Sequence, residues 1–266
     1  MTTPDALTGR RALITGASRG IGEAIATALA AHGSKVVLVS RGGERLERVA
    51  AQIGPAAETR VCDLTDRAQV TALGASVGDV DILVNNAMAG DKFVPITLRD
   101  DEHWAATLEV GLYAPMLLIQ ALAPGMATRG WGSIINISST NGLEPTPMMG
   151  AYCITKAALE QLTKVTAMEL GETGVRCNAL APGIVHTEMA ENLIGGPVWD
   201  YMQSLIPAGR PASLGDVADY AVFLAGDRSR YINGQVLELD GGATTGNFGV
   251  LHAMRAALAA TTPTPG

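Results

Sequence analysis

The chain has 266 residues, of which 47% are hydrophobic and only 4% aromatic, and its formal net charge is -7 at pH 7. This length can bury one large core, and the negative charge without any Lys or Arg cluster argues against nucleic acid as a partner. The opening segment has no apolar run of the kind found in signal peptides, and no uninterrupted run approaches the roughly 18 residues that cross a membrane. The three cysteines lack CxxC spacing and cannot all pair, so we expect a cytoplasmic location and no membrane partner.

Short apolar runs alternate with amphipathic stretches almost to the C-terminus. The apolar runs predict strands at 12–15, 35–40, 58–62, 82–84, 133–137, 175–181 and 236–239. The stretches between most of them predict helices at 20–32, 43–53, 66–77, 100–128, 151–171 and 213–225. Continuous apolar strands separated by helices are typical of a parallel sheet covered on both faces. The sequence therefore predicts an α/β fold with a doubly wound, seven-stranded parallel sheet.

No linker rich in Pro, Gly or Ser divides the chain, so we expect one domain over residues 1–246. Residues 247–266 are expected to form a C-terminal extension. Leu251, Met254 and Leu258 share one helical face, which predicts a helix too short to be stable alone. The last residues, 261–266, are expected to be disordered.

A glycine-rich turn joins the first predicted strand to the first helix. Three glycines, Gly16, Gly20 and Gly22, fall within seven residues. Such glycines let the backbone approach a pyrophosphate, and the helix N-terminus supplies N–H donors to it. The spacing is TGxxxGxG rather than the commoner GxGxxG. We expect dinucleotide contacts from Gly16, Ser18, Arg19, Gly20, Ile21 and Gly22.

The end of the second strand selects between NAD and NADP. NAD sites usually place an acidic residue there, to bond the ribose 2'-hydroxyl. This chain has Ser40 and Arg41 instead, with Arg19 in the glycine-rich turn. Two guanidinium groups can bind a 2'-phosphate through charge-assisted hydrogen bonds, so we expect NADP(H) to be preferred over NAD(H). The alternative is that both arginines are solvated surface residues.

Tyr152 and Lys156 lie four residues apart on a predicted helix, and Ser139 lies thirteen residues before Tyr152. Positions i and i+4 share one helical face, so the phenol and the ammonium can act together. A neighbouring ammonium favours the phenolate, which suits the tyrosine to proton transfer near neutral pH. A surface helix with no such role is the alternative, but the glycine-rich turn in the same chain argues against it.

These motifs together resemble the short-chain dehydrogenase/reductase family, in particular its 3-oxoacyl-carrier-protein-reductase-like branch. The resemblance covers roughly residues 8–243 and rests on 15–22, Asp63, Asn85-Asn86-Ala87, Ser139, Tyr152, Lys156, Pro182-Gly183 and Asp240-Gly241-Gly242. It implies a single-domain Rossmann fold and hydride transfer between nicotinamide and a carbonyl or secondary alcohol. Ser139 would bond the substrate oxygen, Tyr152 would transfer the proton, and Lys156 would favour the tyrosinate.

The resemblance also implies further cofactor contacts and an oligomer. Asp63 and Leu64 would hold the adenine, Asn86 the adenosine side, and Lys156 the nicotinamide ribose. The remaining cofactor residues it implies are Ala87, Tyr152, Pro182, Gly183, Ile184 and Thr187. A homotetramer or homodimer is expected, in which the helices at 100–128 and 151–171 pair across one axis and 231–239 meets its copy across another.

Two positions depart from the family pattern. Gly111 stands where the family usually has an asparagine that helps to position a proton-relay water. Pro115 has no N–H to bond the Gly111 carbonyl, so this carbonyl is expected to hold the water instead, and Gly111 joins the catalytic residues. Restoring an asparagine at 111 is then expected to raise the rate modestly at best. The usual NNAG motif ends here in Met88, which either projects toward the substrate or packs.

The segment 187–210 lies where this family places its substrate loop. With Met88 and Met148, its Met189 and Trp199 predict an apolar, adaptable wall around the substrate, although core helices use the same residue types. No Lys or Arg lies between Thr187 and Pro207, so a strongly anionic small substrate is not expected. The four histidines have no metal-ligand spacing, and no metal is expected.

The sequence thus favours an NADP(H)-dependent carbonyl reductase or alcohol dehydrogenase that acts on a largely apolar small molecule. Two alternatives stay open. One is a NAD-dependent alcohol dehydrogenase of the same family. The other is a dinucleotide-binding protein that kept the fold but turns over weakly, which Gly111 favours.

Overall fold

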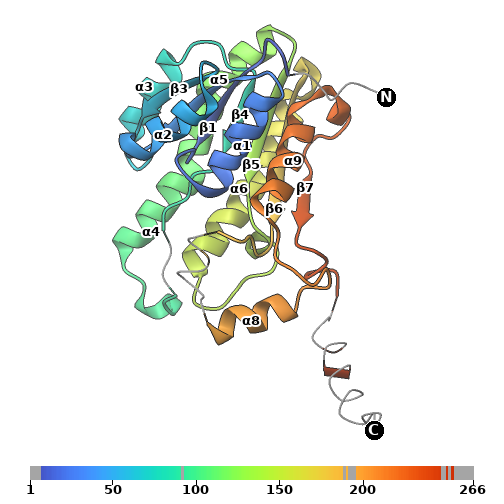
Figure 1. Cartoon of the computed structure of the whole chain (residues 1–266). Helices are drawn as coiled ribbons and strands as arrows, with labels where there is room; N and C mark the ends of the chain where they lie inside the picture. The colour runs from blue at the N-terminus through green and yellow to red at the C-terminus, as the bar shows by residue number, and fades with distance from the viewer. Residues whose placement is uncertain are drawn as a thin grey trace.

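The computed structural model describes residues 7–90, 93–187, 190, 196–246, 250 and 253–254. Its centre is one parallel sheet of seven strands in the order β3-β2-β1-β4-β5-β6-β7 (Figure 1). The chain starts in the middle of this sheet and winds outward in both directions, which confirms the predicted doubly wound topology. The strands are β1 (Arg11–Thr15), β2 (Lys35–Ser40), β3 (Ala57–Val61), β4 (Ile82–Asn85), β5 (Gly132–Ile137), β6 (Val175–Pro182) and β7 (Val236–Leu239).

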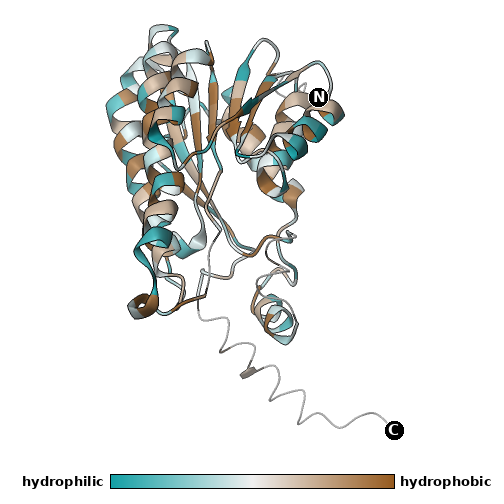
Figure 2. Cartoon of the chain, turned by 90° about the vertical axis from the view of Figure 1, so that its left-hand side faces the viewer, coloured by the Kyte–Doolittle hydropathy of each residue, from teal (hydrophilic) through white to brown (hydrophobic). Residues whose placement is uncertain are grey.

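Helices cover both faces of the sheet. They are α1 (Gly20–Ala31), α2 (Gly43–Ile53), α3 (Arg67–Ser76), α4 (Asp101–Leu108), α5 (Ala114–Thr128), α6 (Gly150–Leu170) and α9 (Leu214–Ala225). Helix α8 (Pro197–Ser204) lies apart from the sheet, beyond the carboxyl ends of its strands (Figure 1). Alternate residues of a strand point to opposite faces, so Ile14 packs with α1, α2 and α9, whereas Leu13 packs with α3, α5 and α6. Figure 2 shows the brown apolar sides of several helices turned toward the strands.

The predicted helix 100–128 is present as one helical run, Asp101–Thr128, with an irregular turn that the sequence analysis did not predict. A π-helical turn at Glu109–Tyr113 separates α4 from α5, and the Ala114 amide donates to the Glu109 carbonyl five residues earlier. Pro115 explains the wider turn, because a proline lacks the amide hydrogen and its ring clashes with the carbonyl four residues earlier, that of Gly111. The run Asp101–Thr128 is apolar and long enough to cross a membrane, yet 50% of its most apolar window is buried in this fold.

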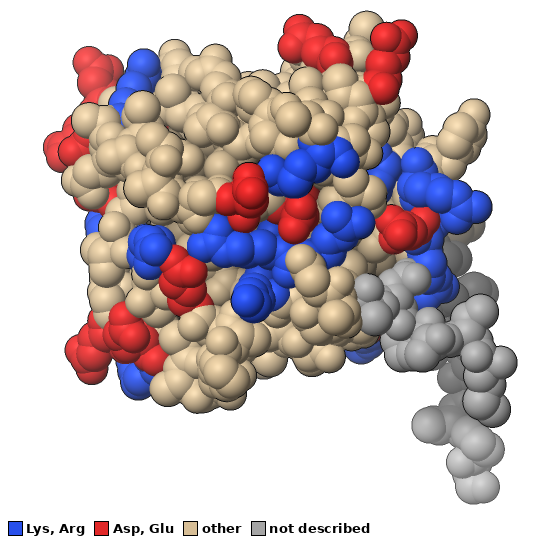
Figure 3. Space-filling view, turned by 90° about the horizontal axis from the view of Figure 1, so that it is seen from above, with Lys and Arg blue, Asp and Glu red and all other residues tan. Residues whose placement is uncertain are grey.

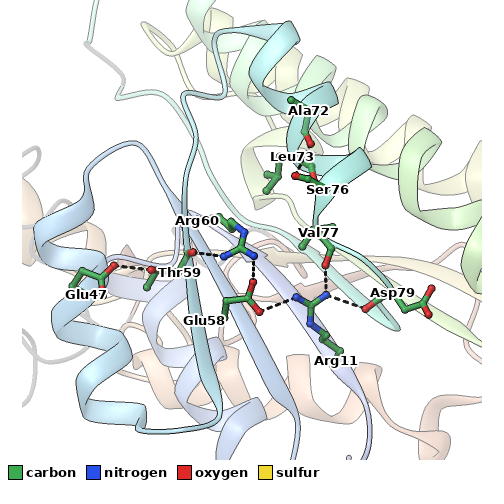
Figure 4. A network of polar contacts seen from close by, with 10 residues as sticks. All are labelled: Arg11, Glu47, Glu58, Thr59, Arg60, Ala72, Leu73, Ser76, Val77 and Asp79. Atoms are coloured by element: carbon green, nitrogen blue, oxygen red, sulfur yellow. Dashed lines mark hydrogen bonds and ion pairs between the residues drawn. The ribbon is translucent and has the colours of Figure 1, made fainter.

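Charged side chains form a band at the end of the sheet where the strands begin (Figure 3). Within it, Arg11 donates to a carboxylate oxygen of Glu58 at 2.9 Å and to the backbone carbonyls of Val77 and Asp79 (Figure 4). Arg129 pairs with the Asp79 carboxylate at 2.7 Å. In a parallel sheet this edge is opposite the carboxyl ends of the strands, so the band lies away from the predicted site.

The substrate loop contains a helix that the sequence did not predict. Helix α8 begins at Pro197, a residue suited to the first helical position, after Gly196 with a φ of 74°. Met189 lies outside the described residues. So does most of the predicted C-terminal extension, from which only Val250, Ala253 and Met254 are described as helical.

Candidate active site

The glycine-rich turn is held by the segment that follows β4. The Asn86 side-chain amide donates to the carbonyls of Thr15 and Gly16, at 2.9 and 3.3 Å, and the Ala87 amide donates to the Thr15 hydroxyl at 3.1 Å. A Cβ on Gly16 would lie 2.8 Å from the Asn86 amide nitrogen, and one on Gly22 would lie 2.5 Å from it. These two glycines are therefore required by packing inside the protein as well as by any ligand.

Gly20 has a different environment. Its φ is +60°, and a Cβ there would meet nothing within 4 Å. Arg19 precedes α1 without capping it through its side chain. The first N–H groups of α1 thus have no side-chain acceptor from the N-cap and border open space, an arrangement that suits the pyrophosphate of a dinucleotide.

Ser40 and Arg41, at the end of β2, differ in their exposure to solvent. Ser40 is buried, and its hydroxyl donates to the Gly42 carbonyl at 2.7 Å. Arg41 is exposed and lies toward Asp63. Hydrogen bonds from Thr65, helped by the charge of Arg41, lower the pKa of the Asp63 carboxyl. Leu64, the other predicted adenine contact, is buried.

Arg19 shares a surface hollow with two arginines that the sequence analysis missed. Arg45 and Arg48 of α2 line this hollow together with Ser18 and Arg19. Their spacing of three residues puts them on one helical face, and this signal was available in the sequence. The hollow concentrates three guanidinium groups beside the open start of α1.

Ser139, Tyr152 and Lys156 come from β5 and α6. Ser139 follows β5 and caps a 3-10 turn at Thr140–Gly142, where its hydroxyl accepts from the Asn141 amide at 3.2 Å. The Lys156 ammonium lies 5.5 Å from the centre of the Tyr152 ring and donates to the Ile137 carbonyl at 2.6 Å. Burial lowers the pKa of Lys156 to about 8, against the opposing charge of Glu160.

The two departures from the family pattern meet in space. A Cβ on Gly111 would lie 2.5 Å from the Thr155 methyl carbon and 2.8 Å from the Met88 sulfur. The Met88 sulfur thus lies against the π-helical turn. Because the space beside Gly111 is taken by two side chains, an asparagine does not fit there without displacing them.

The remaining predicted substrate residues lie on separate loops and helices. Met148 has a φ of 70°, unique among the described non-glycine residues, and its carbonyl accepts from the Val94 amide and the Arg99 guanidinium at 3.0 and 2.8 Å. Its side chain is 45% exposed. The Trp199 ring of α8 lies 6.1 Å from the His186 ring, centre to centre. Backbone strain of this kind persists only where the surroundings impose it, as the two hydrogen bonds do at Met148.

The segment after β6 is anchored to its neighbours. Pro182 is the last residue of β6, and the Gly183 amide donates to the Leu239 carbonyl at 3.0 Å. The Ile184 carbonyl accepts from the Ala212 amide at 2.9 Å, and the Thr187 hydroxyl accepts from the Ala190 amide at 3.0 Å. Across the described part of the chain, no group of three or more His, Cys, Asp and Glu side chains could hold a metal ion.

Glu160 is a further residue that the sequence analysis missed. Its carboxylate is buried and accepts from the Ser138 hydroxyl at 2.7 Å, next to Ser139. It follows Lys156 by four residues, so the i, i+4 reasoning applied to Tyr152 and Lys156 would have found it.

A family model described as enoyl-(acyl carrier protein) reductase matches residues 16–244. D-threitol dehydrogenase of Mycolicibacterium smegmatis is 38% identical over 245 residues, which are 90% of this chain and 94% of the relative. Gluconate 5-dehydrogenase of Gluconobacter oxydans is 39% identical over 256 residues, which are 92% of this chain and 99% of the relative.

A solved structure is similar to this chain in both sequence and fold. The gluconate 5-dehydrogenase of Burkholderia cenocepacia in complex with NADP and tartrate superposes with a TM-score of 0.84 at 37% identity. The match covers 90% of this chain and 97% of that one. Sequence and fold are therefore shared over nearly the whole length of both proteins.

Proposed function

We propose that Ser139, Tyr152 and Lys156 perform the chemistry of this protein. The chain belongs to the short-chain dehydrogenase/reductase family and is an oxidoreductase that acts on CH–OH groups with a nicotinamide cofactor. The cofactor, when bound, supplies or accepts the hydride at its nicotinamide ring. The Ser139 hydroxyl bonds the substrate oxygen and fixes its position. Tyr152 gives that oxygen a proton on reduction and takes it back on oxidation.

The observation that carries this proposal is the placement of Lys156. Its ammonium is buried beside the Tyr152 ring and tied to the end of β5, two residues before Ser139. A phenol ordinarily titrates near pH ~10, and a fixed positive charge nearby favours its ionised form. Lys156 thereby makes Tyr152 a better proton donor in the reduction.

We expect the rate of carbonyl reduction to fall as the pH rises through about 8, the pKa to which burial lowers Lys156. Above this pH the ammonium loses its proton, the tyrosinate is no longer favoured, and Tyr152 becomes a weaker acid. The measurement is kcat for reduction between neutral and alkaline pH at saturating cofactor. A rate that stays constant well above this range would contradict the role of the ammonium.

NADP(H) is the proposed cofactor, in preference to NAD(H). Arg19 borders the open start of α1, and Arg45 and Arg48 line the same hollow, together with the Glu23 carboxylate. These three guanidinium groups and Arg41 are the cations that we propose bind the 2'-phosphate. A charge-assisted hydrogen bond contributes about 1.5–3 kcal/mol, or roughly 10- to 150-fold in kcat/KM. We expect Arg19→Ala to lower kcat/KM for NADPH by this factor and to leave the value for NADH almost unchanged.

The control for Arg19→Ala is Arg230→Ala, which removes an exposed guanidinium that precedes β7. It should change neither cofactor constant. Higher kcat/KM with NADH than with NADPH in the unmodified protein would show that the cofactor proposal is wrong. The same comparison for Arg41→Ala and Arg45→Ala would rank the arginines by their contribution.

The proposed substrate is a neutral polyol or the corresponding keto sugar. The relatives compared above are named for a polyol and a sugar acid. The lack of Lys and Arg between Thr187 and Pro207 favours the neutral member of this pair. Trp199 offers an apolar ring for C–H groups, and the exposed His186 beside it offers a polar nitrogen.

A substrate panel with both cofactors tests the proposed function. It would contain threitol, xylitol and gluconate, the matching keto compounds, and apolar ketones of similar size. Turnover confined to the apolar ketones would favour the Met-rich wall expected from the sequence. No turnover of any compound, with cofactor binding intact, would favour the weakly catalytic alternative.

We propose that the chain assembles as a homodimer or homotetramer through α6. This helix leaves Ile154, Val165 and Met168 on one side, and they are 48%, 49% and 82% exposed. The three cysteines are free and buried, which fits the reducing cytoplasm we propose as its location. We expect sedimentation at micromolar concentration to show an oligomer, and Met168→Glu to shift it toward smaller species.

The matched change is Val61→Glu, since Val61 is also an exposed apolar residue but lies on the edge strand β3. It should leave the oligomer intact. A purely monomeric unmodified protein would contradict the proposed assembly. The extension 247–266 is proposed to contribute a separate contact, tested by deleting it.

A further inference from the structure

Glu160 is a buried carboxylate to which the proposed reaction gives no role. It lies on α6, one turn beyond Lys156 and two turns beyond Tyr152, and only 3% of it is exposed. Removing a charged carboxylate from water is costly unless specific partners compensate. The residue that bonds Glu160 directly precedes a predicted catalytic residue, and a predicted catalytic lysine lies one turn away on the same helix.

The hydrogen-bond partner of Glu160 is Ser138, the residue before Ser139. The Ser138 hydroxyl donates to Glu160 at 2.7 Å, and the Ser138 amide donates to the Leu180 carbonyl of β6 at 2.6 Å. Ser138 is thus bonded on both its side chain and its backbone. Since Ser139 is the next residue, the contact with Glu160 restricts where the Ser139 hydroxyl can lie.

The 3-10 turn that follows Ser139 closes over the same carboxylate. A Cβ on Gly142 would collide with a Glu160 carboxylate oxygen and lie 3.1 Å from the Ala157 amide nitrogen. The Gly142 amide donates back to the Ser139 carbonyl at 2.9 Å. Close packing of the turn on α6 therefore depends on glycine at 142 and on the position of the Glu160 side chain.

Lys156 lies one helical turn before Glu160 on α6, and Lys164 lies one turn after it. Burial alone lowers the pKa of Lys156, and the negative charge of Glu160 opposes that effect. The charged groups that act on Glu160 are Lys156 and Lys164 of its own helix and Glu238 of β7. Burial raises the pKa of Glu160, whereas the Ser138 bond and the two lysines lower it. Since positions i and i+4 share one helical face, the Glu160 carboxylate lies on the side of α6 that carries Lys156.

We propose that Glu160 is a positioning residue that fixes Ser139 through Ser138 and places a negative charge one helical turn from Lys156. It touches neither substrate nor cofactor in this role. The inference rests on the proposed function, because it gives Ser139 and Lys156 the roles assigned there.

Two substitutions separate the two effects. Glu160→Gln keeps an oxygen that can accept from Ser138 and removes the charge, so the pH at which reduction slows should move about one unit lower. Ser138→Ala removes the hydrogen bond from residue 138 to Glu160 and keeps the negative charge of Glu160. It should lower kcat or raise KM for the substrate without moving that pH. The matched control is Glu169→Gln, which removes an exposed carboxylate from the same helix and should do neither.

The charge of Lys156 can also be measured without any turnover. The chain has only four lysines, so NMR of protein carrying 13C-labelled lysine resolves each one, and Lys156→Met assigns the signal. In the cofactor-free protein, Glu160→Gln should lower the pKa of Lys156 and Glu169→Gln should not. If Lys156 titrates alike in Glu160→Gln and the unmodified protein, the electrostatic role is wrong, whatever the enzyme turns over.

A separate result decides whether Glu160 positions Ser139 through Ser138. If Ser138→Ala and the unmodified protein have equal kcat and KM in an active enzyme, Glu160 does not position Ser139. An inactive unmodified protein would instead count against the proposed function, while the lysine titration would still decide the electrostatic role. Should Glu160→Gln fail to fold, Glu160→Asp keeps the charge with a shorter reach and is expected to preserve the pH limit while raising KM.

Discussion

Replacing Tyr152 by Phe is expected to lower kcat/KM by about 10²–10⁴-fold, the usual contribution of a positioned acid–base group. The substitution removes the phenolic oxygen and keeps the ring, which lies 5.5 Å from the Lys156 ammonium and is only partly exposed. The surroundings of Lys156 should therefore be preserved. Because the proton donor is lost and the binding surface is kept, cofactor affinity should be almost unchanged.

Two measurements check this expectation. Steady-state reduction gives the loss in kcat/KM, and quenching of protein fluorescence by NADPH gives the cofactor Kd. Tyr220→Phe is the matched control, because Tyr220 of α9 is 47% exposed, lies outside the substrate loop and should be indifferent to losing its hydroxyl. A Tyr152→Phe protein that reduces carbonyls at the unmodified rate would refute the catalytic assignment.

Gly111→Asn is expected to reduce turnover and to destabilise the fold, since overpacking a filled site costs about 1–3 kcal/mol of stability. The Cβ alone would lie 2.5 Å from the Thr155 methyl carbon, and Thr155 is fully buried one residue before Lys156. Displacing Thr155 therefore shifts the backbone that carries Lys156. The Met88 sulfur, 2.8 Å from the same Cβ position, belongs to a flexible side chain and can move more easily.

A double-mutant cycle tests whether the two unusual residues compensate each other. Met88→Gly frees the space beside position 111, so the pair Met88→Gly with Gly111→Asn should recover part of the lost rate. Residues in contact typically show coupling of about 0.5–3 kcal/mol, whereas independent sites are additive. Thr155→Ser deletes the methyl group that also obstructs position 111, so it should further increase the recovered rate. Strict additivity of Met88→Gly and Gly111→Asn would show that their contact has no consequence for turnover.

Local patterns in the sequence determined most of the framework. The run of apolar residues at Lys35–Ser40 predicted β2 with the bounds that the structure has, and the 3.6-residue period did the same for α2 at Gly43–Ile53. The spacing of Tyr152 and Lys156 likewise sufficed to place both on one face of α6. These features depend on backbone geometry within one segment, and the sequence expresses that geometry directly.

The irregular backbone was harder to predict from such patterns. Pro115 showed that the Gly111 carbonyl would lose its helical bond, but not that a π-helical turn would result. The left-handed backbone conformation of Met148 could not be predicted from the sequence, because methionine does not prefer it. Two hydrogen bonds from residues distant in the sequence hold the Met148 carbonyl in this conformation. Helix α8 was missed because glycine and proline surround its first turn, as they also do in loops.

Contacts between segments were decided only by the tertiary structure. Met88 meets Gly111 and Thr155, and Glu160 meets Ser138 and Gly142, although these residues come from different elements of the chain. Periodicity specifies which face of a helix is buried, but not which side chain of a neighbouring element fills the space against it. That depends on how closely the elements approach, which close packing of the whole core determines. The sequence by itself therefore determined the fold and the residues that we propose as catalytic, whereas the tertiary structure decided what fills the space beside Gly111 and what surrounds Lys156.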